Sequence, residues 1–128
     1  MAHYSRLYTI VIDVPADDHD RELAFWRDAI GRPLIQYERF PEYHGGELLH
    51  GQEFRLLVQR LGHGPARVHL DIHTDDLDAE VARLEGLGAE KVEQMHAWWI
   101  MRDPGGMLFC VVPDPAGTLN DGNAQRWD

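Results

Sequence analysis

The amino-acid sequence predicts an α+β protein in which two βαβββ modules form a curved mixed sheet around a central cleft. The order strand, helix and three strands occurs in residues 6–62 and returns in residues 66–113. One helix covers only one face of a small sheet, so we expect the uncovered faces of the two modules to border the cleft. Residues 1–113 then form a single domain. Residues 114–128 are rich in Gly, Asn and Asp without periodicity, and are predicted to be a C-terminal tail.

The first module begins with the apolar run LYTIVIDVP, residues 7–15, which predicts a strand. The segment DDHDRELAFWRDAIG follows, with acidic residues at its start and Gly31 at its end, as is typical of a helix. Leu23, Trp26 and Ile30 fall on one stripe of this helix, which predicts that Trp26 is a core residue. Three strand-like runs come next, around residues 33–39, 46–50 and 54–61, separated by PEYHGG and HGQE, which predict turns.

The second module repeats this order. Its first strand is predicted from RVHLDIHTDD, residues 67–76, and its helix from DDLDAEVARLEGLGA. Either Asp75 or Asp76 is expected to cap the helix, and Gly88 is expected to take a left-handed conformation at its end. Strand-like runs over residues 91–96, 97–102 and 107–112 close the module, with DPGG as the last tight turn.

In the first strand of the second module, polar and apolar residues alternate strictly. The apolar positions are Val68, Leu70 and Ile72, and the polar positions are His69, Asp71 and His73. The apolar side is predicted to pack under the helices and the polar side to face the cleft. His69 and Asp71 would lie roughly 6.6 Å apart and could converge on one ion, whereas His69 and His73, about 13 Å apart, could not. Taken alone, the strand is equally typical of polar side chains exposed to water.

Charge and cysteine content limit the classes of partner. Twelve basic and twenty-two acidic residues give a formal net charge of −10, which disfavours nucleic acid and anionic membranes and makes cationic or neutral small ligands easier to accommodate. The single cysteine, Cys110, excludes an intrachain disulfide. The N-terminal sequence shows no signal peptide or spanning segment, so we expect a cytoplasmic protein.

Three segments of the second module resemble the vicinal oxygen chelate superfamily, the group of glyoxalase I, bleomycin-resistance proteins and extradiol dioxygenases. They are RVHLDI, DDLDAEVARLEGLGAEKV and WWIMRDPGGMLFCVV, and the resemblance extends over about residues 6–113. It is strongest to small glyoxalase-like proteins. The resemblance implies paired βαβββ modules, usually in a homodimer, around a cleft that holds a divalent metal ion in the catalytic members.

The resemblance also implies a set of metal ligands, one from the first and one from the last strand of each module. His69 matches the first-strand position of the second module, and Gln59 falls near the last-strand position of the first, where the family often has glutamate. Cys110 falls where metal-using members usually have glutamate, and Thr9 or a neighbour falls where His, Gln or Glu is expected. The expected cofactor is one divalent metal ion held by His69 and Gln59, with an incomplete ligand set because both carboxylates are missing.

Further candidates surround this set. Asp71 is the candidate catalytic base, and it could also replace a missing carboxylate ligand or orient His69. Trp98 and Trp99 point to opposite faces of one strand, so one is expected in the core and the other as an aromatic wall of the ligand site. Arg102 could bind an anionic group or form a surface ion pair, and Cys110 could border the ligand or be a small buried hydrophobe.

Two functions fit these observations. The first is a glyoxalase-like enzyme of the vicinal oxygen chelate type, with lyase, isomerase or dioxygenase chemistry on a small molecule in the cleft. The alternative is a metal-free protein of the bleomycin-resistance type that binds or sequesters a small aromatic or cationic compound. The missing carboxylates favour binding or a degenerate site.

Overall fold

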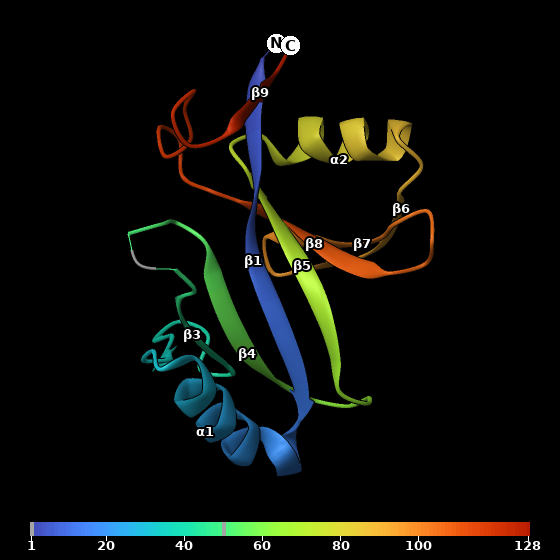
Figure 1. The fold of residues 1–128 in the computed structure, drawn as a ribbon. Helices are drawn as coiled ribbons and strands as arrows, with labels where there is room; N and C mark the ends of the chain where they lie inside the picture. The colour runs from blue at the N-terminus through green and yellow to red at the C-terminus, as the bar shows by residue number, and fades with distance from the viewer. Residues whose placement is uncertain (1, 50) are drawn as a thin grey trace. The chain divides into compact units, whose positions relative to one another are not determined.

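The computed structural model describes residues 2–49 and 51–128 and contains both predicted βαβββ modules (Figure 1). The first module consists of β1 (His3–Pro15), the short 3-10 helix η1 (Ala16–Asp18), α1 (His19–Ile30), β2 (Ile35–Gln36), β3 (Tyr43–Glu47) and β4 (Arg55–Leu61). The second consists of β5 (Arg67–Thr74), α2 (Leu77–Gly86), β6 (Glu90–Met95), β7 (Trp98–Arg102), β8 (Leu108–Pro113) and an additional strand, β9 (Gln125–Trp127). The predicted α+β fold class is confirmed. His50, within the strand predicted around 46–50, lies outside the described residues.

The chain divides into two compact units that do not coincide with the two modules. The central unit is Thr9–His69, and the terminal unit combines the residues before Thr9 with Leu70–Asp128. Strands β1 and β5 therefore contribute residues to both units.

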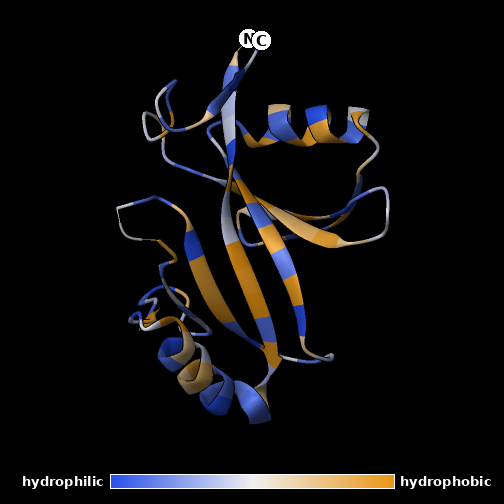
Figure 2. Cartoon of the chain, in the orientation of Figure 1, coloured by the Kyte–Doolittle hydropathy of each residue, from blue (hydrophilic) through white to orange (hydrophobic). Residues whose placement is uncertain are grey.

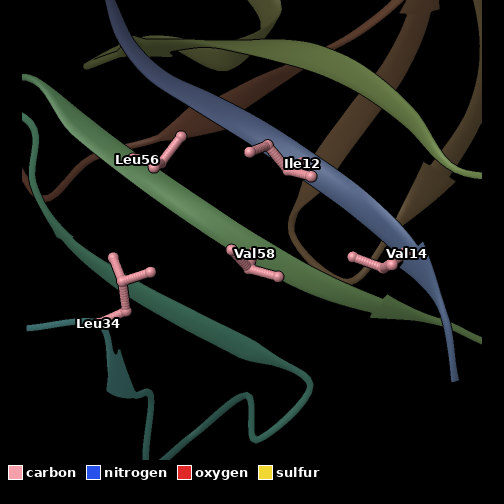
Figure 3. Close-up of a cluster of buried hydrophobic side chains, with 5 residues drawn as sticks. All are labelled: Ile12, Val14, Leu34, Leu56 and Val58. Atoms are coloured by element: carbon pink, nitrogen blue, oxygen red, sulfur yellow. The ribbon is translucent and has the colours of Figure 1, made fainter. Parts of the chain in front are cut away.

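The sheet of the central unit has the strand order β2-β3-β4-β1. β1 and β4 are parallel, with Ile12 opposite Val58, and β3 and β4 are antiparallel. One face carries an apolar core formed by Ile12, Val14, Leu34, Leu56 and Val58 (Figure 3), and Figure 2 shows the apolar stretches of β1 and β4 that supply it. Leu23, Trp26 and Ile30 of α1 pack against this core, so the predicted helical stripe is confirmed. Because side chains alternate along a strand, Thr9, Val11 and Asp13 occupy the opposite face.

Two glycines of β3 serve close packing. In the segment PEYHGG, Pro41 and Glu42 form the predicted turn, but Tyr43–Glu47 forms a strand, so the turn predicted at the two glycines is wrong. A Cβ atom on Gly46 would lie 2.2 Å from the carbonyl oxygen of Pro33, and one on Gly45 would lie 2.9 Å from the hydroxyl of Tyr37. Glycine is therefore required here because neighbouring groups approach the strand closely.

The sheet of the terminal unit has the order β5-β8-β7-β6, with β9 paired to the start of β1. β5 and β8 are parallel, whereas β7 is antiparallel to both of its neighbours. Its core consists of Val81, Leu84, Met101 and Val111, with Ile72, Leu77, Ala89, Trp99 and Phe109 packed against it. Residues from α2 and from three strands thus share one apolar cluster on one face of this sheet.

The structure at the start of α2 shows which of the two predicted residues, Asp75 or Asp76, caps the helix. The Asp76 side chain accepts a hydrogen bond from the backbone N–H of Ala79 at 3.1 Å, so Asp76 is the cap. Asp75 instead accepts a hydrogen bond from the backbone N–H of Tyr4 at 2.8 Å. Gly88 has a φ of 108°, which confirms the positive φ expected after this helix.

Part of the predicted tail forms strand β9. It pairs antiparallel with the start of β1, with His3 opposite Trp127 and Ser5 opposite Gln125. The Trp127 indole N–H donates to the Ser5 hydroxyl at 2.9 Å, and the Arg83 guanidinium lies 3.8 Å from the Trp127 ring centroid. The final residues therefore contact both β1 and α2.

Glu80, on the same helix as Arg83, is fully buried. Its carboxylate bonds to His3 Nε2 at 2.8 Å and to Arg83 Nε and Nη2, each at 2.8 Å. Burial tends to raise the pKa of Glu80, but hydrogen bonds from Arg83, His3 and Ser5 outweigh it, and the pKa lies below its ordinary value. Glu80 thus links α2 to the start of β1 as an ionised group.

Burial along β5 differs from the predicted pattern at its first residues. Val68 is 52% exposed and Leu70 is 36% exposed, whereas His69 and Asp71 are each 8% exposed. Ile72 packs on the core as expected, but Leu70 lines an open apolar pocket of about 330 Å³ together with Leu7, Leu84, Leu87 and Met107. The prediction that Leu70 is packed under a helix is therefore wrong.

Neither helix in the described parts of the chain is long and apolar enough to cross a membrane.

Candidate functional site

The face of the central unit opposite α1 holds a buried carboxylate paired with a histidine. Asp13 on β1 is 1% exposed, and its Oδ2 lies 2.6 Å from Nδ1 of His69 on β5. Arg67 Nε lies 3.5 Å from the same oxygen. Three residues from two neighbouring strands therefore meet at one carboxylate oxygen.

This pairing fixes the orientation of the His69 ring. A carboxylate only accepts hydrogen bonds, so the proton of the neutral ring is on Nδ1 and donates to Asp13. Nε2 then carries the lone pair that a metal ion or an acidic proton would require. Carboxylate–histidine pairs of this kind hold the imidazole in one tautomer in many metal and acid–base sites.

The second oxygen of Asp13 has no hydrogen-bond partner among the described residues. Asp13 Oδ1 is completely inaccessible to solvent in the described structure. Leaving a buried carboxylate oxygen without a donor is energetically costly, and native proteins rarely do so unless another group binds there. A buried water molecule, a cation or a hydrogen-bond donor from a ligand would satisfy this atom.

Gln59 and Thr9 lie on the same face of the sheet. Asp13 is in register with Gln59 on β4, and residues in register on neighbouring parallel strands project to the same side. Thr9 is almost fully buried and is in register with Arg55. Neighbouring strands therefore bring together Asp13, Gln59 and His69, which we call the Asp13 group.

Of the Asp13 group, the sequence predicted His69 and Gln59 and missed Asp13. The run TIVIDV contained a usable signal, because a period of two places Thr9, Val11 and Asp13 on one face. An acidic residue inside an otherwise apolar strand, on the face of a candidate site residue, is unusual for a structural position.

The terminal unit holds the other predicted residues. Asp71 is buried on β5 and in register with the half-buried Cys110 on β8, which is itself opposite Ile100 on β7. Alternation along β7 places Trp98 on the same face as Ile100, with its ring 4.9 Å from that of His96. Asp71, Cys110 and Trp98 therefore share the face opposite the α2 core.

Trp99 and Arg102 are placed differently. Trp99 packs against the α2 core, and Lys91 Nζ lies 4.8 Å from its ring centroid. Trp98 and Trp99 thus point to opposite faces as predicted, and Trp98 is the one on the face opposite the α2 core. Arg102 is exposed at the end of β7, opposite Leu108.

The donor atoms of the Asp13 group are of the chemical kinds that bind a divalent metal ion. They comprise an imidazole nitrogen, a buried carboxylate oxygen and an amide oxygen, which suit borderline ions such as Zn²⁺, Fe²⁺ or Mn²⁺. The unpartnered Asp13 Oδ1 supplies a carboxylate that the ligand set inferred from the sequence lacked. Asp13 could act as a ligand through Oδ1 or as the group that orients His69 through Oδ2.

Solved structures with the same fold include several enzymes. The chain is similar to methylmalonyl-CoA epimerase from Mycobacterium tuberculosis, with 21% identity, a TM-score of 0.58, and coverage of 85% of this chain and 88% of that chain. A variant of the Streptomyces coelicolor methylmalonyl-CoA epimerase in complex with 2-nitronate-propionyl-CoA matches at 17% identity, a TM-score of 0.57, and coverage of 89% and 99%. The 2,2',3-trihydroxybiphenyl 1,2-dioxygenase from Sphingomonas wittichii matches at 16% identity and a TM-score of 0.54, with 87% of this chain aligned to 41% of that chain.

These similarities to solved structures concern the fold. No curated protein matches the sequence. A family model described as the glyoxalase-like domain matches residues 9–112. That range includes the whole Asp13 group and most of both modules, and the resemblance to the vicinal oxygen chelate superfamily is confirmed. The chain therefore belongs to the glyoxalase-like domain family.

Proposed function

We propose that the protein is an enzyme of the vicinal oxygen chelate type that acts on a small molecule at the Asp13 group, with one divalent metal ion as its cofactor. The observation that carries this proposal is the buried Asp13–His69 pair, in which one carboxylate oxygen fixes the histidine and the other has no partner among the described residues. A protein that enclosed only an uncharged aromatic compound would gain nothing from burying such a pair, because desolvating a carboxylate is costly. A metal-free protein that binds a cationic compound would benefit from it, and metal titration distinguishes this alternative.

Each residue of the Asp13 group has a distinct role in this proposal. His69 ligates through Nε2, and Asp13 orients the imidazole and contributes negative charge. Gln59 supplies an amide oxygen, which is a neutral and weaker ligand. A bound divalent ion would polarise an oxygen atom of the substrate. The candidates of the terminal unit, Asp71, Trp98, Trp99, Arg102 and Cys110, stay predictions.

Metal titration tests this function. Protein prepared without a metal-affinity tag and freed of metal by chelation is titrated with Zn²⁺, Ni²⁺, Mn²⁺ and Fe²⁺, and binding is measured by calorimetry and elemental analysis. The wild type should bind a single ion per chain, and His69→Ala should lose this binding because the only imidazole of the group is removed. His63→Ala serves as the matched control, because His63 is an exposed histidine of the same unit.

Two results would contradict the proposal. If the wild type takes up none of the four ions, the metal-dependent enzyme is excluded, and the metal-free binding protein becomes the better hypothesis. If His69→Ala binds as tightly as the wild type, the ion is held elsewhere. Circular dichroism of each variant shows whether a loss of binding reflects loss of the fold.

A homodimer is a further proposal, taken from the family resemblance. Light scattering at high micromolar concentration should give twice the mass of the 128-residue chain. A monomer at that concentration would contradict it. A cytoplasmic location likewise stays a proposal, and fractionation of cells that produce the protein tests it.

A further inference from the structure

We infer that the central unit contains a second binding site, a pocket around Arg55 that takes the carboxylate group of a small organic acid. The pocket is open, has a volume of about 370 Å³, and lies between the segment after α1 and strands β3 and β4. Its charged residues are Arg32, Arg55 and Glu47, and its apolar lining includes Pro33, Ile35 and Tyr37. This volume is in the range of small-molecule sites.

The two arginines are in different electrostatic situations. Arg32 is matched by Glu47, with Arg32 Nη2 3.3 Å from Glu47 Oε2 and Arg32 Nε donating to the Glu47 carbonyl oxygen at 3.1 Å. Arg55 Nε donates to the hydroxyl oxygen of Tyr37 at 3.0 Å. Within residues 2–49 and 51–128, the structure shows no carboxylate paired with the Arg55 guanidinium. Two positive charges therefore face one negative charge, and the pocket has a net positive charge in a chain with a formal net charge of −10.

The side chain of Arg55 is oriented for a planar anion. Because its Nε is engaged by Tyr37, Nη1 and Nη2 stay available as a pair of parallel donors, the geometry that a carboxylate accepts in a bidentate manner. The Tyr37 hydroxyl accepts from Nε and can donate its own proton to the same ligand. Arg55 is half-buried, which strengthens such an interaction relative to an exposed arginine.

Gly45 leaves the space that this arrangement requires. A Cβ atom at position 45 would lie 2.9 Å from the Tyr37 hydroxyl oxygen and 2.9 Å from Leu57 Cδ1. A larger residue would displace the Tyr37 hydroxyl and with it the partner of Arg55 Nε. The backbone at Gly45 thus contributes to the position of the guanidinium.

The surroundings favour a carboxylate on an apolar or aromatic body. Pro33, Ile35 and the Tyr37 ring offer apolar surface beside the guanidinium, and the net charge of the chain disfavours polyanions such as nucleic acids. The strongly acidic composition had suggested cationic or neutral ligands. The local charge of the pocket is opposite, which shows that net charge does not determine the sign of an individual site.

The position of Arg55 relates the pocket to the Asp13 group. Arg55 and Gln59 lie on the same face of β4, four residues apart, and are in register with Thr9 and Asp13 on β1. Four residues of a strand span about 13 Å. If the proposed function is correct, a substrate that reaches both sites is an elongated acid with its carboxylate on Arg55. Carboxylate binding itself does not depend on that function.

A binding experiment on the metal-free protein tests the pocket. Amide chemical shifts are followed by NMR during titration with benzoate, with its neutral analogue benzamide, and with inorganic phosphate. Benzoate should give saturable shifts at Gly45, Gly46 and Arg55, and benzamide should bind at least about tenfold more weakly because it lacks the charge. Arg55→Gln should weaken benzoate binding at least about tenfold, and Arg55→Lys should recover part of the loss, since it restores the charge without the paired donors.

Arg21→Gln serves as the control, because Arg21 is an exposed arginine of the same unit outside the pocket, and it should bind benzoate like the wild type. The amide spectrum of Arg55→Gln shows directly whether that variant is folded. Equal binding of benzoate by wild type and Arg55→Gln would overturn the inference, as would equal shifts from chloride or from benzamide. Tighter binding of phosphate than of benzoate would overturn the carboxylate assignment. Because no metal ion or turnover is involved, the result is independent of the metal titration.

Discussion

Replacing Glu80 by alanine is expected to lower the free energy of unfolding by about 3–5 kcal/mol, the range measured when one partner of a buried ion pair is removed. The Glu80 carboxylate is fully buried and bonded to both His3 and Arg83. Its loss leaves the partly buried Arg83 guanidinium without a carboxylate and detaches α2 from the start of β1. Urea denaturation followed by fluorescence measures the change.

Glu85→Ala is the matched control, because Glu85 is an exposed glutamate on the same helix. It should change the free energy of unfolding by no more than about 0.5 kcal/mol. If the two variants are equally stable, the buried network does not contribute to stability.

The same carboxylate predicts a specific response to acid. The pKa of Glu80 is lowered in the folded state from its ordinary value of 4.5, so the folded protein holds the ionised form more strongly than the unfolded chain does. This contribution is complete above the unfolded pKa and is lost as the pH falls through the folded pKa. The difference in stability between wild type and Glu80→Ala should therefore shrink below about pH 4.5. A difference that is constant from pH 7 to about pH 2 would contradict the assignment.

Replacing Asp13 by asparagine is expected to reduce metal affinity about 10- to 100-fold, the loss typical when a carboxylate that supports a ligating histidine is removed. Asparagine keeps the size and can still accept a hydrogen bond from His69 Nδ1, so the ring stays in place while the charge is lost. Competition with a chelator of known affinity measures the change. This prediction depends on the proposed metal site.

Asp17→Asn is the corresponding control, because Asp17 is an exposed aspartate in η1 just after β1, and it should bind metal like the wild type. The stability of Asp13→Asn separates two roles for the carboxylate. A functional carboxylate with an unpartnered oxygen costs folding energy, so the variant should be at least as stable as the wild type. A large loss of stability with unchanged metal affinity would identify Asp13 as a structural residue.

The fold class could be predicted from the sequence because each βαβββ module carries its own periodicity. Gly31 ends α1 with a left-handed conformation, and Asp76 caps α2, as their local sequences indicate. β3 begins three residues before the strand predicted around 46–50, because Gly45 and Gly46 normally indicate a turn and here permit close approach by Tyr37 and Pro33. β9 was missed because its strand partner lies at the other end of the sequence, beyond the reach of any local pattern.

The candidate site could be predicted only in part. His69 and Gln59 were found through the family resemblance, whereas Asp13 required knowledge of which strands are neighbours. Glu80 has the sequence environment of an ordinary surface residue on an amphipathic helix, and its burial depends in part on His3, a residue 77 positions away in the sequence. The two faces of β5 were predicted correctly, since Ile72 packs on the α2 core, but the exposure of Val68 and Leu70 was not, because periodicity separates the faces of a strand and does not determine how much of each face is covered.

The pairing of β9 with β1 also affects the order in which the molecule is assembled. Ser5 and Trp127, joined by a hydrogen bond, are separated by 122 positions, so this contact forms only after a very long loop has closed. During synthesis on the ribosome, the first residues of β1 emerge long before their partner strand exists. The residues of the central unit are contiguous from Thr9 to His69, so this unit can form its contacts early in synthesis. The terminal unit is complete only after residues 125–127 have been synthesised and have left the ribosome. Until then, the unpaired edge at the start of β1 is open to pairing with other nascent chains, so this segment is exposed to misassembly.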